Sequence, residues 1–172
     1  EGAASPMALV IGIGSEHTTV VISKGGNIVV TYVIHTGGKA LTRALAADLG
    51  MDQVQAEEYK KTYGLEKDVL SGKISNSVRP LLENLVAEVK RVISFYQGRS
   101  QDTEPIRRVV LVGGGAKLPG LVVFLTETLG IETQIGDPWQ KVTGTQKLSN
   151  LPFDPILFAE AVGLALKPSS GS

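Results

Sequence analysis

The chain has 172 residues, enough for one domain whose core buries roughly 70% of the surface of the unfolded chain. Its 17 basic residues balance 17 acidic ones, so no net field favours nucleic acid or an anionic membrane as a partner. There is no cysteine, which excludes disulfides and thiolate metal sites, and the longest early apolar run, residues 7–13, is too short to span a bilayer. We therefore expect a cytoplasmic protein that binds no nucleic acid and does not insert directly into a membrane.

Three stretches rich in β-branched residues open the chain and predict strands over residues 7–13, 17–23 and 28–34. They are separated by Gly14-Ser15 and by a turn containing Gly25-Gly26, which indicates an antiparallel meander. A dinucleotide-binding βαβ unit would need a helix after its first glycine loop, and here another strand follows. The Gly12-x-Gly14 pair is therefore not that fingerprint.

The apolar period becomes helical after residue 36. A first helix stops at Gly50, where glycine suits a left-handed end. Asp52 then begins a second helix, with Gln55 three residues on in a capping-box arrangement, and Gly64 ends it.

The polar stretch 66–76 is typical of an exposed loop. The longest helix is predicted over residues 78–96, where apolar side chains recur at i, i+3 and i+4. Pro80 is compatible with this helix because we place it in the first turn. Residues 100–105 form a polar linker.

Residues 109–112 predict a strand buried on both faces of a mostly parallel sheet, because they are aliphatic without polar interruption. Three glycines follow at 113–115, and we place Pro119 in the first turn of a helix that ends at Gly130. Backbone without a Cβ can lie flat against a planar or charged ligand, and a helix start offers unpaired N–H groups. The unit has the shape of a nucleotide site, although glycine turns after buried strands also occur without a ligand.

A short strand at 131–135, a loop at 136–150 and a last helix at 154–166 complete the predicted elements. Antiparallel strands extended by parallel ones through crossover helices indicate an α/β fold, a mixed five-stranded sheet flanked by helices. We expect the turns after Ile13 and Val112 to face one common hollow.

The predicted organisation is one lobe interrupted by a helical insertion. The lobe comprises residues 7–35 and 76–167, and the inserted helical subdomain comprises residues 36–75. Residues 1–6 and 168–172 are expected to be linker or artificial tails.

These motifs resemble the C-terminal half of an actin-like ATPase of the RNase H-like superfamily. Residues 7–21 resemble its second phosphate hairpin, residues 109–121 its adenosine motif and residues 56–64 the helix that contacts ribose and adenine. Within the superfamily the chain is most similar to the PilM family of type IV pilus assembly proteins, with the division protein FtsA next. The segments that carry this likeness are 36–45, 56–64, 135–139 and 161–166.

The resemblance implies a set of nucleotide-contacting residues. Gly14, Ser15 and Thr18 would hold the phosphates, Gly113 and Gly114 would lie against the adenosine, and the stem of Lys117 would cover the base. On the second helix, Glu57 would bond the ribose hydroxyls, Lys60 would lie near the adenine and Gly64 would leave room.

Each of these residues also has an ordinary interpretation. The first three can form a plain β-turn, and Glu57 with Lys60 can form an ion pair on a solvated helix. Gly64 can be only a helix cap, and Lys117 only a surface lysine.

ATP with magnesium is the cofactor that the resemblance implies for the full-length protein. The family usually has an acidic residue where this chain has Gly12, and that residue orients the hydrated ion. Glu16 and His17 are poor substitutes. We name no catalytic residue and no metal ligand, and expect at most a weak ATPase in the full-length protein, with no turnover and weak or absent nucleotide binding in this chain.

The function implied is that of a nucleotide-binding lobe in a cytoplasmic PilM-like scaffold, with ATP held in a cleft shared with an N-terminal lobe. The partners would be that lobe, inner-membrane pilus assembly proteins and, in self-association, further copies. The protein would be peripheral to the inner membrane through these partners.

Three alternatives stay open at this point. An FtsA-like division protein would carry a C-terminal amphipathic membrane helix. A sugar-kinase-type phosphotransferase would carry a catalytic carboxylate in the other lobe, and a degenerate interaction module would bind no nucleotide.

Overall fold

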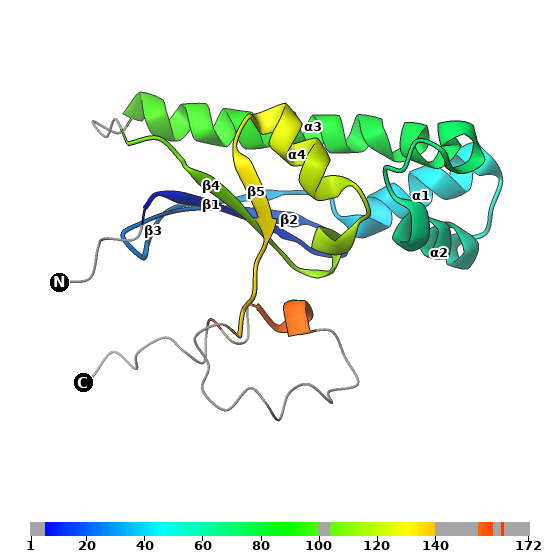
Figure 1. Ribbon diagram of the computed structural model, residues 1–172, viewed down its shortest axis with the longest axis horizontal. Helices are drawn as coiled ribbons and strands as arrows, with labels where there is room; N and C mark the ends of the chain where they lie inside the picture. The colour runs from blue at the N-terminus through cyan, green and yellow to red at the C-terminus, as the bar shows by residue number, and fades with distance from the viewer. Residues whose placement is uncertain (1–5, 100–103, 140–154, 160–162, 164–172) are drawn as a thin grey trace.

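A computed structural model describes residues 6–99, 104–139, 155–159 and 163. Five strands form one mixed sheet in the order β3-β2-β1-β4-β5 (Figure 1). The strands are β1 (Ala8–Ile13), β2 (Thr18–Lys24), β3 (Asn27–Ile34), β4 (Arg108–Val112) and β5 (Glu132–Ile135). The first three pair antiparallel, whereas β4 pairs parallel with both β1 and β5. The predicted mixed five-stranded α/β sheet is therefore confirmed.

Two helices cover one face of this sheet, and two more lie beyond its end (Figure 1). The covering helices are α3 (Lys73–Arg99) and α4 (Leu121–Leu129), and those at the end are α1 (Gly38–Leu49) and α2 (Gln53–Tyr63). In the part of the chain that the structure describes, short 3-10 turns occur at η1 (Val69–Gly72), η2 (Gly114–Lys117) and η4 (Pro155–Phe158). No helix within the described residues is long and apolar enough to cross a bilayer.

The main core lies between the sheet and its covering helices. Alternate residues of β1, β2 and β4 face an apolar stripe on α3, and burial of each such side chain contributes roughly 1.5–3 kcal/mol. These side chains include Leu9, Ile11, Val20, Ile22, Val109, Leu111, Val78, Leu82, Leu85 and Val89. A second, smaller cluster joins α1 and α2 to the start of α3 and contains Leu45, Ala46, Ala56 and Ile74.

The predicted loop over residues 66–76 is wrong at its C-terminal end. The helix α3 already begins at Lys73, and Ile74 and Ser75 are buried, because Ile74 belongs to the smaller cluster. Pro80 is consequently the eighth residue of α3 and lies outside its first turn. Pro80 and Asn76, whose carbonyl loses its helical donor, are both exposed, so water can replace the lost hydrogen bond.

The placement of Pro119 in a helical first turn is also wrong. The glycines after β4 first form the 3-10 turn η2, and α4 begins only at Leu121 after the cap Gly120. Instead, the carbonyl oxygen of Pro119 accepts a hydrogen bond of 2.9 Å from the N–H of Leu65. The predicted helix at 154–166 lies largely outside the described residues.

Gly113 leaves β4 in a conformation that other residues rarely adopt. Its φ is 81° and its ψ is 170°. A Cβ at this position would lie 2.7 Å from the carbonyl oxygen of Ile13, which is backbone and cannot move aside. Glycine is therefore required here by conformation and by space.

We expect Gly113→Ala to lower the free energy of unfolding by about 2 kcal/mol or more, because both the φ value and the contact with Ile13 oppose a side chain. Urea denaturation measures the change. Gly98→Ala is the control, because Gly98 lies in α3 with open space around its Cα and should be neutral or slightly stabilising. Equal effects of the two substitutions would contradict this account of the turn.

Candidate functional site

The turns that follow β1 and β4 lie side by side at one edge of the sheet. The two strands are parallel neighbours, with Gly12 opposite Val112, so their C-terminal ends coincide. A Cβ added to Gly113 would lie only 2.7 Å from the carbonyl oxygen of Ile13, so the two backbones approach closely. The expectation that both turns face one hollow is confirmed, because Gly14 and Gly113 line the same cleft.

A cleft of about 1410 Å³ opens between these turns and the helices α1 and α2. Most of the residues predicted to contact a nucleotide line it: Gly14, Ser15, Glu57, Lys60, Gly113, Gly114 and Lys117. They come from three separate parts of the chain, which only the fold brings together.

Thr18 and Gly64 do not line the cleft. Thr18 is fully buried, and its hydroxyl donates a hydrogen bond of 2.7 Å to the carbonyl oxygen of Thr36. Gly64 caps α2 and touches Pro119, whose carbonyl oxygen would lie 2.5 Å from an added Cβ. In this structure both residues hold neighbouring segments together.

The β1–β2 turn is tied to the start of α1. The N–H of Gly14 donates to the carbonyl oxygen of His17 within the turn, at 3.0 Å. The carbonyl oxygens of Gly14 and Ser15 accept hydrogen bonds of 2.9 Å from the N–H groups of Gly38 and Lys39. The first amides of α1, which could otherwise bind an anion, are thus used by the hairpin.

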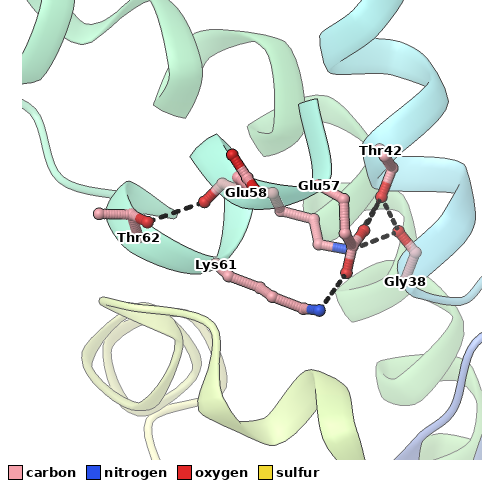
Figure 2. A network of polar contacts seen from close by, with 7 residues as sticks. Gly38, Thr42, Glu57, Glu58, Lys61 and Thr62 are labelled. Carbon is pink, nitrogen blue, oxygen red and sulfur yellow. Dashed lines mark hydrogen bonds and ion pairs between the residues drawn. The ribbon is translucent and has the colours of Figure 1, made fainter. Parts of the chain in front are cut away.

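A polar cluster forms the α1–α2 wall of the cleft. Lys60 Nζ lies 2.6 Å from Glu57 Oε2, 2.8 Å from the Thr42 hydroxyl and 3.0 Å from the Gly38 carbonyl oxygen. The Thr42 hydroxyl also donates to Glu57 Oε2, at 2.5 Å, and Lys61 Nζ lies 3.2 Å from Glu57 Oε1. Figure 2 shows Glu57 facing Thr42 and Gly38 on one side and Lys61 on the other.

Glu57 is the carboxylate most perturbed by this cluster. Partial burial by itself would raise its pKa, but the hydrogen bonds from Lys60 and Thr42 and the charge of Lys60 lower the pKa to about 2. Glu57 is therefore ionised at neutral pH.

Three members of the cluster, Gly38, Thr42 and Lys61, were not predicted as site residues. Gly38 and Thr42 fall within the segment 36–45 that resembles PilM, and Lys61 falls within the segment 56–64, but nothing local marks the Thr42 hydroxyl as a partner of Lys60, 18 residues away. Glu16, considered as a substitute acid, instead pairs with Lys39 at 2.6 Å on the surface and does not line the cleft.

The donor set does not fit a magnesium ion at the turns. Among the described residues the carboxylates that line the cleft are Glu57 and Glu58, both on α2, and Glu57 already faces two lysines. Gly12 lines the cleft without a carboxylate, although a Cβ there would meet Val112 only at 3.4 Å, an ordinary contact.

A family model described as "Type IV pilus assembly protein PilM" matches residues 1–169. The chain belongs to the PilM family. A chain of a PilM-PilN type IV pilus biogenesis complex is 32% identical, with a TM-score of 0.75 over 95% of this chain and 46% of that chain. The present chain thus spans about half the length of that chain of the complex.

Two further matches are more distant. MreB5 of Spiroplasma citri bound to ADP is 18% identical, with a TM-score of 0.62 over 93% of this chain and 52% of its own, and shows the actin-like fold alone. Cell division protein FtsA of Streptococcus pneumoniae is 26% identical over 149 residues, 77% of this chain and 33% of FtsA. The FtsA alternative is weaker than the PilM assignment, because it rests on a lower identity and a smaller share of the chain.

Glu57→Gln should make the chain less stable above pH 5, by about 1–2 kcal/mol after allowance for solvent screening. Because folding lowers the pKa of Glu57 from 4.5 to about 2, its contribution is fully present above pH 4.5 and is lost as the pH falls toward 2. The difference between wild type and variant should therefore shrink between pH 5 and pH 3. Urea denaturation at both pH values measures it.

Glu16→Gln provides the control for this series, since its carboxylate is paired with Lys39 but exposed. Exposed ion pairs contribute little, so its effect should be smaller than that of Glu57→Gln at pH 5. If the stability difference between wild type and Glu57→Gln stayed constant from pH 5 to pH 3, the hydrogen bonds from Lys60 and Thr42 would not lower the pKa of Glu57 as described.

Proposed function

We propose that this chain is the nucleotide-binding lobe of a PilM-type scaffold for type IV pilus assembly. ATP would lie in the cleft described above, with the rest of its site supplied by an N-terminal lobe. The observation that carries the proposal is the meeting of two glycine turns at one sheet edge, opposite a helix with an ionised Glu57. The ADP complex of MreB5, which shares the fold, is consistent with a nucleotide in such a cleft.

The roles of the residues follow from what each can still offer. Gly113 and Gly114 present bare backbone against which an adenosine can lie, and the stem of Lys117 would cover the base. Ser15 offers a hydroxyl to the phosphates, whereas Gly14 contributes space, because its N–H bonds within the turn.

The carboxylate of Glu57 is the proposed ribose contact. Its Oε2 atom is occupied by Lys60 and Thr42, but among the described residues Oε1 pairs with Lys61 alone, whose side chain is 72% exposed. Lys61 can move into solvent at little cost and leave Oε1 to accept from ribose hydroxyls. Thr18 and Gly64 would act from outside the cleft, by fixing the segments that line it.

Binding, without hydrolysis, is the proposed chemistry. Because the turns lack a carboxylate for magnesium, we expect no turnover by this chain, and only weak affinity without the second lobe. The bound state would support assembly with inner-membrane pilus components, as the PilM-PilN complex suggests for a partner of that kind. The scaffold would be cytoplasmic and peripheral to the membrane, with residues 36–75 as an inserted helical subdomain.

A titration of the isotope-labelled chain with ATP, followed by NMR, tests the proposal. We expect shifts at Ser15, Glu57, Gly113 and Gly114 that saturate only at millimolar ligand. Gly114→Val should weaken binding about tenfold, equivalent to about 1.4 kcal/mol, because its side chain would occupy the cleft. Gly98→Val is the control, since Gly98 lies in α3 away from the cleft and should leave the affinity unchanged.

Two results would argue against this assignment. Shifts that avoid both glycine turns would place any nucleotide elsewhere, and the absence of shifts at 10 mM ATP, roughly the weakest binding that such a titration detects, would favour an interaction module without nucleotide. Micromolar affinity or turnover by this chain would contradict the expected weakness and the expected lack of hydrolysis.

A further inference from the structure

Lys60 lines the cleft, yet its ammonium group has no donor left for a ligand. An ammonium carries three N–H donors, and Lys60 has three protein acceptors, on Gly38, Thr42 and Glu57, between 2.6 and 3.0 Å. Its side chain is only 9% exposed. For Lys60 to bond a nucleotide, it would have to give up one of these three part-buried hydrogen bonds, which is costly.

The Gly38 acceptor connects Lys60 to the other side of the cleft. Gly38 is the first residue of α1, and its N–H donates to the Gly14 carbonyl oxygen while the next N–H, of Lys39, donates to Ser15. The preceding residue, Gly37, lies so close to the turn that a Cβ would be 2.6 Å from the Ser15 carbonyl oxygen. The start of α1 and the β1–β2 turn therefore form one unit.

We infer that Lys60 is a positioning residue that fixes the β1–β2 turn through the start of α1, so that α2, on the ribose side of the cleft, sets where the turn meets the phosphates. This inference rests on the nucleotide-binding function proposed above. It assigns to Lys60 a role in phosphate affinity without contact with any part of the nucleotide.

Lys61 provides a matched control. It is the next residue of α2 and pairs with the same carboxylate, at 3.2 Å from Glu57 Oε1, but it is exposed and none of its described contacts reaches α1. Lys61→Met removes the same unit of charge as Lys60→Met. It leaves the hydrogen bond between Lys60 and the Gly38 carbonyl oxygen intact. Any effect specific to Lys60→Met thus reflects the buried contacts and not the loss of charge near the cleft.

Amide hydrogen exchange of the chain without ligand tests the link directly. In Lys60→Met we expect protection of the Gly38 and Lys39 amides to fall about tenfold, equivalent to about 1.4 kcal/mol, relative to the amide of Leu111 in the β1–β4 ladder. A general loss of stability would lower protection at all three amides equally. In Lys61→Met the three should keep their wild-type ratios.

A second variant guards against failure to fold. The double variant Glu57→Gln/Lys60→Met removes both charges of the buried pair, so the α1–α2 wall of the cleft keeps no unpaired buried charge. Glu57→Gln alone is the reference with which the double variant is compared. The double variant should show the same selective loss of protection at Gly38 and Lys39, whereas Glu57→Gln should not.

Titrations with ATP and with adenosine then test the effect on the phosphates. In Lys60→Met the ratio of the adenosine Kd to the ATP Kd should fall about tenfold, with the adenosine Kd within about twofold of wild type. In Lys61→Met this ratio should stay within about threefold, the range expected of an exposed charge.

Three outcomes overturn the inference. Unchanged protection of Gly38 and Lys39 in the Lys60 variants would show that Lys60 does not hold the turn, and equal losses of adenosine and ATP affinity would show that it contacts the nucleoside itself. If the ratio of the adenosine Kd to the ATP Kd fell equally in Lys61→Met, the effect would come from the lost charge and not from the contacts of Lys60. If no variant binds either ligand, the proposed function fails, while the exchange data still decide whether Lys60 fixes the turn.

Discussion

The parallel pairing of β1 with β4 is the constraint on which the site depends. Parallel strands end at the same edge, so the register that sets Gly12 against Val112 also sets the two following turns in contact. The long helix α3 makes this pairing possible, because parallel strands need a crossover and this helix supplies it while covering the core (Figure 1). An antiparallel β4 would have carried its glycines to the opposite end of the sheet.

The polar α1–α2 wall of the cleft depends on how Lys60 is bonded. A lysine as buried as Lys60 is tolerated only when its donors are satisfied, and the carboxylate of Glu57, the hydroxyl of Thr42 and one helix-start carbonyl satisfy them. The smaller cluster around Leu45 and Ala56 holds α1 against α2 and so keeps these groups within reach. Apolar packing beneath the wall and hydrogen bonding within it thus support the same geometry.

Much of the fold was predictable because its signals are local. The double-glycine turn, with Gly25 and Gly26 both at positive φ, marks the β2–β3 hairpin. Asp52 caps α2 through the amides of Val54 and Gln55, as its spacing suggests.

The start of α3 was predicted wrongly because its signal is not local. A single isoleucine in a polar stretch did not reveal that α3 starts at Lys73, because the cluster that buries Ile74 is assembled from residues far away in the chain.

The sequence by itself determined the order of the elements, the glycine turns and the likeness to PilM, since periodicity and turn chemistry act over a few residues. Only the tertiary structure decided which candidate residues reach the cleft. Thr18 bonds Thr36 and Gly64 packs against Pro119, both outside the cleft. All three N–H donors of Lys60 are bonded to acceptors within the protein. The physical reason is that a hydrogen-bond partner 18 or 22 residues away, as Thr42 and Gly38 are from Lys60, leaves no trace in the local pattern.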